Sequence, residues 1–116
     1  MNDQNEPIPE PWRRKVAAVL RQGDPDRVFI RGRARRDWAS LPFCPFDYEL
    51  PDALAAALDD ENLIGKKHVM DEPGETYAFI FSFRNLAIYA KVNLTTPDEV
   101  VIVYSAHRPL KGEKLL

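Results

Sequence analysis

The last third of the chain constrains the fold most, because it holds three runs of β-forming residues joined by short links. The runs are TYAFIFSF at residues 76–83, LAIYAKVNL at residues 86–94 and VVIVYSAH at residues 100–107. They are rich in the β-branched and aromatic side chains that strands favour. Links as short as Arg84-Asn85 and TTPDE join neighbouring strands as hairpins. The sequence therefore predicts an antiparallel three-strand meander.

An amphipathic helix is predicted over residues 11–22. Its apolar residues recur at helical spacing, at Trp12, Val16, Val19 and Leu20. Pro11 suits the first turn of a helix and Gly23 is a good terminator. The arginines between the apolar residues are expected on the opposite face.

Shorter elements are predicted between this helix and the meander. They are a strand around residues 27–31, one or two helical turns over residues 33–40, a helical segment from Pro51 to Gly65 and a connection over residues 66–75. The predicted class is α+β, with N-terminal helices packed on one face of a C-terminal antiparallel sheet made of the meander and the short early strand.

Length and composition predict one domain over residues 11–109, because 116 residues are enough for one core and 45% of them are apolar. Residues 1–10 are acidic and proline-rich and are expected to form a disordered or extended arm, and residues 110–116 a flexible tail. Cys44 is the single cysteine, which excludes an internal disulfide and a cysteine-based zinc site. The chain has no apolar run of membrane-spanning length, so a cytoplasmic protein without membrane contact is expected.

Charge is unevenly distributed along the chain. Residues 13–36 hold nine basic and two acidic residues, a net of +7, and residues 47–75 hold nine acidic and two basic residues, a net of −7. The basic segment could bind an anionic partner, or the two segments could neutralise each other in the folded chain.

Side chains alternate between the faces of a strand, so the second strand of the meander has two different faces. One face carries Leu86, Ile88, Ala90, Val92 and Leu94, which predicts contact with the helices. The other face carries Tyr89, Lys91 and Asn93. The parity of the third strand that joins them is not determined by the sequence, so the place of His107 stays open.

A sheet face with tyrosine, lysine and histidine suits RNA cleavage without a metal. The 2′-hydroxyl of RNA attacks the adjacent phosphate, which requires a base, an acid and cations for the developing charge. Tyrosine can also stack on a base. The structural alternative is that exposed tyrosine and lysine are ordinary residues of a sheet surface.

The order of elements resembles that of the RelE-superfamily toxins of bacterial toxin–antitoxin systems, most closely the motility quorum-sensing regulator branch. The segments that carry this resemblance are RKVAAVLRQG, LPFCPFDYELPDALAAALDDENLIGKK, IYAKVNL and VVIVYSAH. The resemblance implies a RelE-like fold and a metal-independent mRNA endoribonuclease that acts on RNA, often on the ribosome, and is neutralised by a cognate antitoxin protein. A glutamine that the family carries before the sheet has no counterpart in VMDEPGE.

Carried onto this chain, the resemblance implies Tyr89 and Lys91, one of Lys66 and Lys67, and one of His107 and Arg108 as site residues. The residues chosen as catalytic are Tyr89, Lys91, His107 and Lys67, and those chosen for substrate binding are Lys66, Arg84 and Arg108. Arg31, Arg33 and Arg35 join the substrate-binding group because FIRGRARRDW interleaves arginines with aromatic residues, as nucleic-acid-binding surfaces do. His107 is chosen for proton transfer because histidine changes charge near neutral pH. Neither a metal nor another cofactor is expected, since His68 and His107 match no strong ligand spacing. The alternative function is a non-catalytic module that uses the basic N-terminal segment to bind nucleic acid or an acidic protein.

Overall fold

The computed structural model describes residues 5–96 and 98–110, which form three helices and six strands. The helices are α1 (Glu10–Gln22), α2 (Gly32–Ala39) and α3 (Glu49–Leu58). The strands are β1 (Glu6–Pro7), β2 (Val28–Ile30), β3 (Ile64–His68), β4 (Glu75–Phe83), β5 (Leu86–Leu94) and β6 (Val101–His107). They form one sheet in the order β1-β3-β4-β5-β6-β2, in which β2 pairs with β6 in parallel and the other pairs are antiparallel. The predicted α+β class is confirmed, and the sheet is larger and more mixed than predicted.

Two strands, β1 and β3, lie in segments for which the sequence predicts an arm and a connection. Strand β3 pairs with β4, and β1 pairs with the outer edge of β3. The prediction that Gly65 ends a helical segment is wrong, because α3 ends at Leu58 and Gly65 lies within β3. A Cβ at Gly65 would lie 2.6 Å from the carbonyl oxygen of Ala78 and 2.7 Å from Cδ1 of Ile8, so the strand needs glycine there. Residues 1–4 of the predicted arm and 111–116 of the predicted tail lie outside the described residues.

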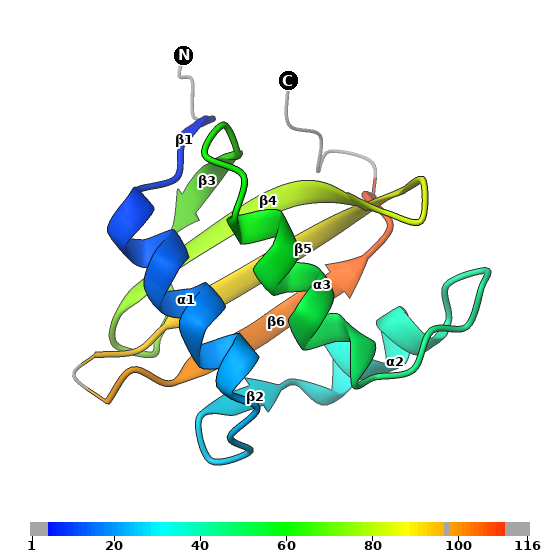
Figure 1. Ribbon diagram of the computed structural model, residues 1–116, viewed down its shortest axis with the longest axis horizontal. Helices are drawn as coiled ribbons and strands as arrows, with labels where there is room; N and C mark the ends of the chain where they lie inside the picture. The colour runs from blue at the N-terminus through cyan, green and yellow to red at the C-terminus, as the bar shows by residue number, and fades with distance from the viewer. Residues whose placement is uncertain (1–4, 97, 111–116) are drawn as a thin grey trace.

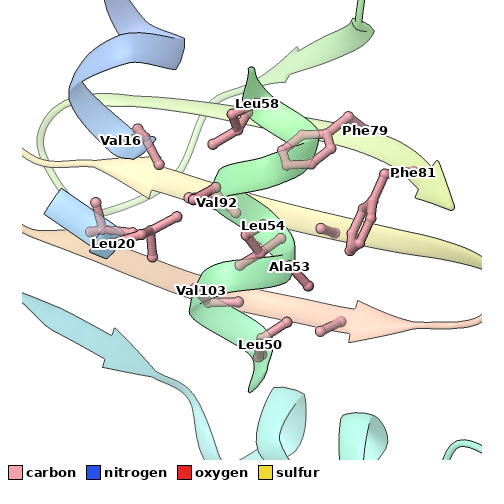
Figure 2. Close-up of a cluster of buried hydrophobic side chains, with 14 of the residues drawn as sticks. Val16, Leu20, Leu50, Ala53, Leu54, Leu58, Phe79, Phe81, Val92 and Val103 are labelled. Atoms are coloured by element: carbon pink, nitrogen blue, oxygen red, sulfur yellow. The ribbon is translucent and has the colours of Figure 1, made fainter. Parts of the chain in front are cut away.

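The core lies between the sheet and the two long helices. Helices α1 and α3 pack side by side across the same face of the sheet (Figure 1). Leu50, Leu54 and Leu58 project from α3 toward the strands (Figure 2), and each is at most 1% exposed. Burying a leucine fully stabilises the fold by about 1.5–3 kcal/mol, so this stripe holds α3 on the sheet. No helix in the described ranges is both long and apolar enough to cross a membrane.

Arg13 departs from the prediction that the arginines of α1 face solvent. It is 7% exposed, and its guanidinium donates to the carbonyl oxygens of Ile8 at 3.1 Å and Leu58 at 2.9 Å. The Leu58 carbonyl belongs to the last turn of α3, where helices leave carbonyl groups without intrahelical partners. Arg13 therefore joins the segment after β1 to the end of α3.

Candidate functional site

The candidate site lies on the sheet face opposite α1 and α3, which we call the open face. Directly paired residues of neighbouring strands share a face, so the register of β3 to β6 identifies its members. The polar residues that this register puts on the open face are Lys66, His68, Thr76, Ser82, Tyr89, Lys91, Asn93, Ser105 and His107. The register thus gathers on one face side chains that are up to 41 positions apart in the sequence.

The central feature of the open face is the pair formed by Tyr89 and His107. Their Cα atoms are direct partners across β5 and β6, and their rings stack with centroids 5.4 Å apart and an interplanar angle of 22°. Tyr89 is 7% exposed, so its ring offers little surface to a nucleobase and instead supports the half-buried imidazole of His107. His107 Nδ1 lies 2.7 Å from the carbonyl oxygen of Arg108. Because a carbonyl oxygen can only accept, a hydrogen bond at this distance is donated by Nδ1.

A β-bulge in β6 settles the parity that the sequence left open. Lys91 pairs with Ser105 and Val92 pairs with Val103, so Tyr104 is an extra residue between two ladder positions. Val103 and Ala106 are both 0% exposed within the core, although they differ in parity. Bulges re-aim side chains in this way and are common beside active sites. Neither parity considered from the sequence holds along the whole of β6.

A second basic cluster on the open face combines Lys66 and His68 of β3 with Lys91 of β5. Lys66 and Lys91 both pair with Ala78 from opposite sides of β4. The pKa of His68 is lowered from its ordinary value of 6.5, first by desolvation and then by the charges of Lys91 and Lys66. The sequence analysis did not include His68 among the candidate site residues, because it did not predict β3. The available signal was the two-residue spacing between Lys66 and His68, which puts both side chains on one face of a strand.

Three of the basic residues proposed from the sequence lie away from the open face. Lys67 pairs with Tyr77 on the helix-covered face and forms an ion pair with Glu75 at 3.3 Å. Arg84 is in the β4–β5 turn, where it bonds to Glu49 of α3 and lies 4.8 Å from the ring centroid of Phe83.

Arg35 forms an ion pair with Asp47 at 3.2 Å and lines a cavity together with Leu20 of α1. Arg33 is exposed on α2, and Arg108 is exposed next to His107. Lys67 does not share a face with Tyr89, contrary to the expectation from the sequence. It follows Lys66 in β3, and adjacent residues of a strand point to opposite faces.

Arg31 is held at one side of the open face by the loop between β3 and β4. Its guanidinium lies 5.5 Å from the ring centroid of Tyr104 and forms an ion pair with Glu72 at 3.0 Å. Tyr104 donates its hydroxyl proton to the same carboxylate. Burial, followed by this hydrogen bond, raises the pKa of Tyr104 to about 12, and the hydrogen bond from Tyr104 lowers the pKa of Glu72. Tyr104 and Glu72 were in neither the catalytic nor the substrate-binding group predicted from the sequence. Their contact depends on the path of the loop between β3 and β4.

The charge asymmetry of the sequence is neutralised in part within the fold. Ion pairs join the basic segment to the acidic one at Arg21–Asp59, Arg31–Glu72 and Arg35–Asp47. Three of the nine basic residues in residues 13–36 are thus engaged by the acidic segment. Mutual neutralisation thus accounts for part of the charge asymmetry.

The two histidines of the open face cannot act on one phosphodiester bond. His68 and His107 lie on β3 and β6, which are three strand spacings apart in the sheet. At about 4.8 Å per spacing this is about 14 Å, before any offset along the strands. The histidine that lies beside Tyr89 and Lys91 is therefore His107, whereas Lys66 and His68 lie farther across the open face on β3.

No known protein family, curated protein or solved structure matches this chain. Within residues 5–96 and 98–110, no group of three or more histidine, cysteine, aspartate or glutamate side chains is placed to hold a metal ion.

Proposed function

We propose that the protein is a metal-independent endoribonuclease of the RelE-like toxin type, with its catalytic centre at Tyr89, Lys91 and His107. The observation that carries the proposal is the register of β5 and β6, which pairs Tyr89 with His107 and puts Lys91 on the same face. The resemblance of the chain's elements to RelE-superfamily toxins points to the same chemistry. As in that family, the substrate is mRNA and the controlling partner is an antitoxin protein.

In the proposed reaction, Nε2 of His107 accepts the proton of the 2′-hydroxyl as its oxygen attacks the adjacent phosphorus. The P–O5′ bond breaks, which gives a 2′,3′-cyclic phosphate and a 5′-hydroxyl end. Lys91 is two ladder positions from the Tyr89–His107 pair, on the same face, and its ammonium group neutralises the charge of the phosphorane and donates the proton that the 5′ oxygen needs. Tyr89 is a positioning residue, because its buried ring fixes the plane of the imidazole.

Substrate binding in this proposal uses the cations around the centre. Lys66 lies across β4 from Lys91, and Arg108 follows His107. Arg31 binds a phosphate farther along the strand, in exchange for the carboxylate of Glu72 that it holds in the free protein. Binding through several phosphate contacts should weaken steeply as salt is raised.

The test is cleavage of a labelled single-stranded RNA in the presence of EDTA. His107→Ala should lower the cleavage rate about 100-fold or more, since a positioned acid or base contributes about 10²–10⁴-fold. Lys91→Ala should also lower it strongly, because it removes the proposed acid and a positive charge from the face that carries the pair. Lys67→Ala is the matched control and should change the rate less than about 2-fold, because Lys67 lies on the other face and interacts with Glu75.

The products and a modified substrate provide a second check. A single 2′-deoxy nucleotide at the cleavage site should block the reaction, and the upstream product should carry a cyclic phosphate. The proposal is wrong if RNA is not cut under these conditions, if the 2′-deoxy substrate is cut, or if Lys67→Ala loses as much activity as Lys91→Ala.

A further inference from the structure

A groove beside α3, on the helix-covered side of the molecule, is a second candidate binding surface. It has a volume of about 580 Å³. Its apolar lining comes from α3, the turn that follows it and β4, at Ala53, Ala56, Ala57, Leu63, Phe81 and Phe83. We call this surface the α3–β4 groove. Figure 2 shows Phe81 beside α3, on the flank from which Ala53 projects.

The floor of the groove is a stretch of sheet edge. Strand β3 pairs with β4 only as far as Phe79, so among the described residues no strand pairs with residues 80–83 on that side. In Figure 1, β1 and β3 flank only the first part of β4. An exposed edge presents backbone N–H and C=O groups that another extended chain can pair with. The groove therefore suits a strand better than a helix.

Acidic residues from opposite ends of α3 line the groove. Asp52 and Asp60 line it eight positions apart, on α3 and just after it. Glu49 lines it too, but its carboxylate already bonds to Arg84. At about 1.5 Å per residue, Asp52 and Asp60 are separated by about 12 Å.

Exposed aromatic residues continue the surface at the α3 N-terminus. Tyr48 lines the groove and is 69% exposed, and Phe46 stacks on it with centroids 5.2 Å apart and is 63% exposed. Exposed aromatic clusters beside an apolar groove are typical of protein interfaces, where aromatic side chains supply much of the binding energy.

We propose that the α3–β4 groove binds an extended segment of a partner protein, which adds a strand to residues 80–83 and carries basic residues four positions apart. Residues k, k+2 and k+4 of a strand point to the same side and span about 13 Å, close to the separation of Asp52 and Asp60. The segment then reads basic-x-apolar-x-basic, with its central side chain against Phe81 and Phe83 and its outer ones toward the two aspartates. This surface is separate from the open face, so the inference does not depend on nuclease activity.

The experiment uses a fluorescent peptide with the core Lys-Thr-Val-Thr-Lys and a control peptide of the same composition, Lys-Val-Thr-Lys-Thr. In the control the lysines are three positions apart and point to opposite sides of a strand. The first peptide should bind the full chain, measured by fluorescence anisotropy, at least about tenfold more tightly than the control. Amide hydrogens in residues 80–83 should gain protection from exchange when it binds.

Two alanine substitutions separate the groove from general charge effects. Ala56→Arg puts a long cation into the groove and should weaken peptide binding at least about tenfold. Ala18→Arg makes the same change on the exposed face of α1 and should leave binding unchanged. Circular dichroism should show that both variants are folded.

Three results would overturn the inference. One is equal affinity for the two peptides, or no binding of either. Another is peptide binding that Ala56→Arg leaves intact. The third is a concentration-dependent dimer that Ala56→Arg abolishes, since the occupant of the groove would then be a second copy of this chain.

Discussion

The buried hydrogen bond between Thr76 and Asn93 allows a quantitative test of the open face. Thr76 is 1% exposed and Asn93 is 0% exposed, and the threonine hydroxyl donates to Asn93 Oδ1 at 2.7 Å. Thr76→Val keeps the shape of the side chain but leaves the amide oxygen of Asn93 without this donor. Removing one partner of a buried hydrogen bond costs about 1–3 kcal/mol in free energy of unfolding.

Urea unfolding measures this cost directly. For a domain of this size, each kcal/mol lowers Tm by about 3–6 °C, so calorimetry gives an independent value. The double variant Thr76→Val with Asn93→Leu removes both partners and should recover part of the loss, with a coupling energy of at least about 0.5 kcal/mol. Thr96→Val, on an exposed threonine, is the control and should change stability by less than about 0.5 kcal/mol.

The same pair connects the sheet to the loop that holds Arg31. Asn93 Nδ2 donates to the carbonyl oxygen of Pro73 at 3.3 Å, next to Glu72. A loss from Thr76→Val below about 0.3 kcal/mol, or effects of the two substitutions that simply add, would refute the reasoning, because the bond would then contribute nothing that water cannot replace.

Three further predictions concern the core, the open face and the β3–β4 loop. Leu54→Ala empties a fully buried site under α3 and should cost about 2–5 kcal/mol in urea unfolding; a loss below about 1 kcal/mol would mean that α3 is not held by this stripe. His68 should titrate below 6.5 by NMR, and Lys91→Gln should raise its pKa because a neighbouring positive charge is removed. Because the pKa of His68 is lower in the folded state, the folded protein binds fewer protons there than the unfolded chain. The contribution of His68 to stability should therefore be complete above pH 6.5 and should decrease as the pH falls through its folded pKa. An unchanged His68 titration in Lys91→Gln would contradict the proposed cluster. Gly74→Ala should cost more than about 1 kcal/mol, because φ is +113° and the new Cβ would lie 2.0 Å from the Leu94 carbonyl oxygen; wild-type stability by calorimetry would contradict this.

Part of the candidate site could be predicted from the sequence. Alternation along β5 puts Tyr89 and Lys91 on one face, because the period of a strand is fixed by its backbone geometry. The same rule could have separated Lys66 from Lys67, but only once β3 was known to be a strand. Its sequence, IGKKH, has a glycine and two adjacent lysines, and it is held as a strand by pairing with β4 and β1.

Local pattern by itself determined α1, the presence of two further helices, the three long strands and the apolar face of β5. These features depend on residues that are near in sequence, where the periods of 3.6 and 2 are set by the backbone. Tertiary structure decided the rest: the bulge in β6, the pairing of Tyr89 with His107, the path that brings Glu72 to Arg31, and the edge at residues 80–83, which no other described strand joins on the β3 side. Each of these depends on how distant segments meet, and a shift of register by one residue would have put His107 on the other face of the sheet.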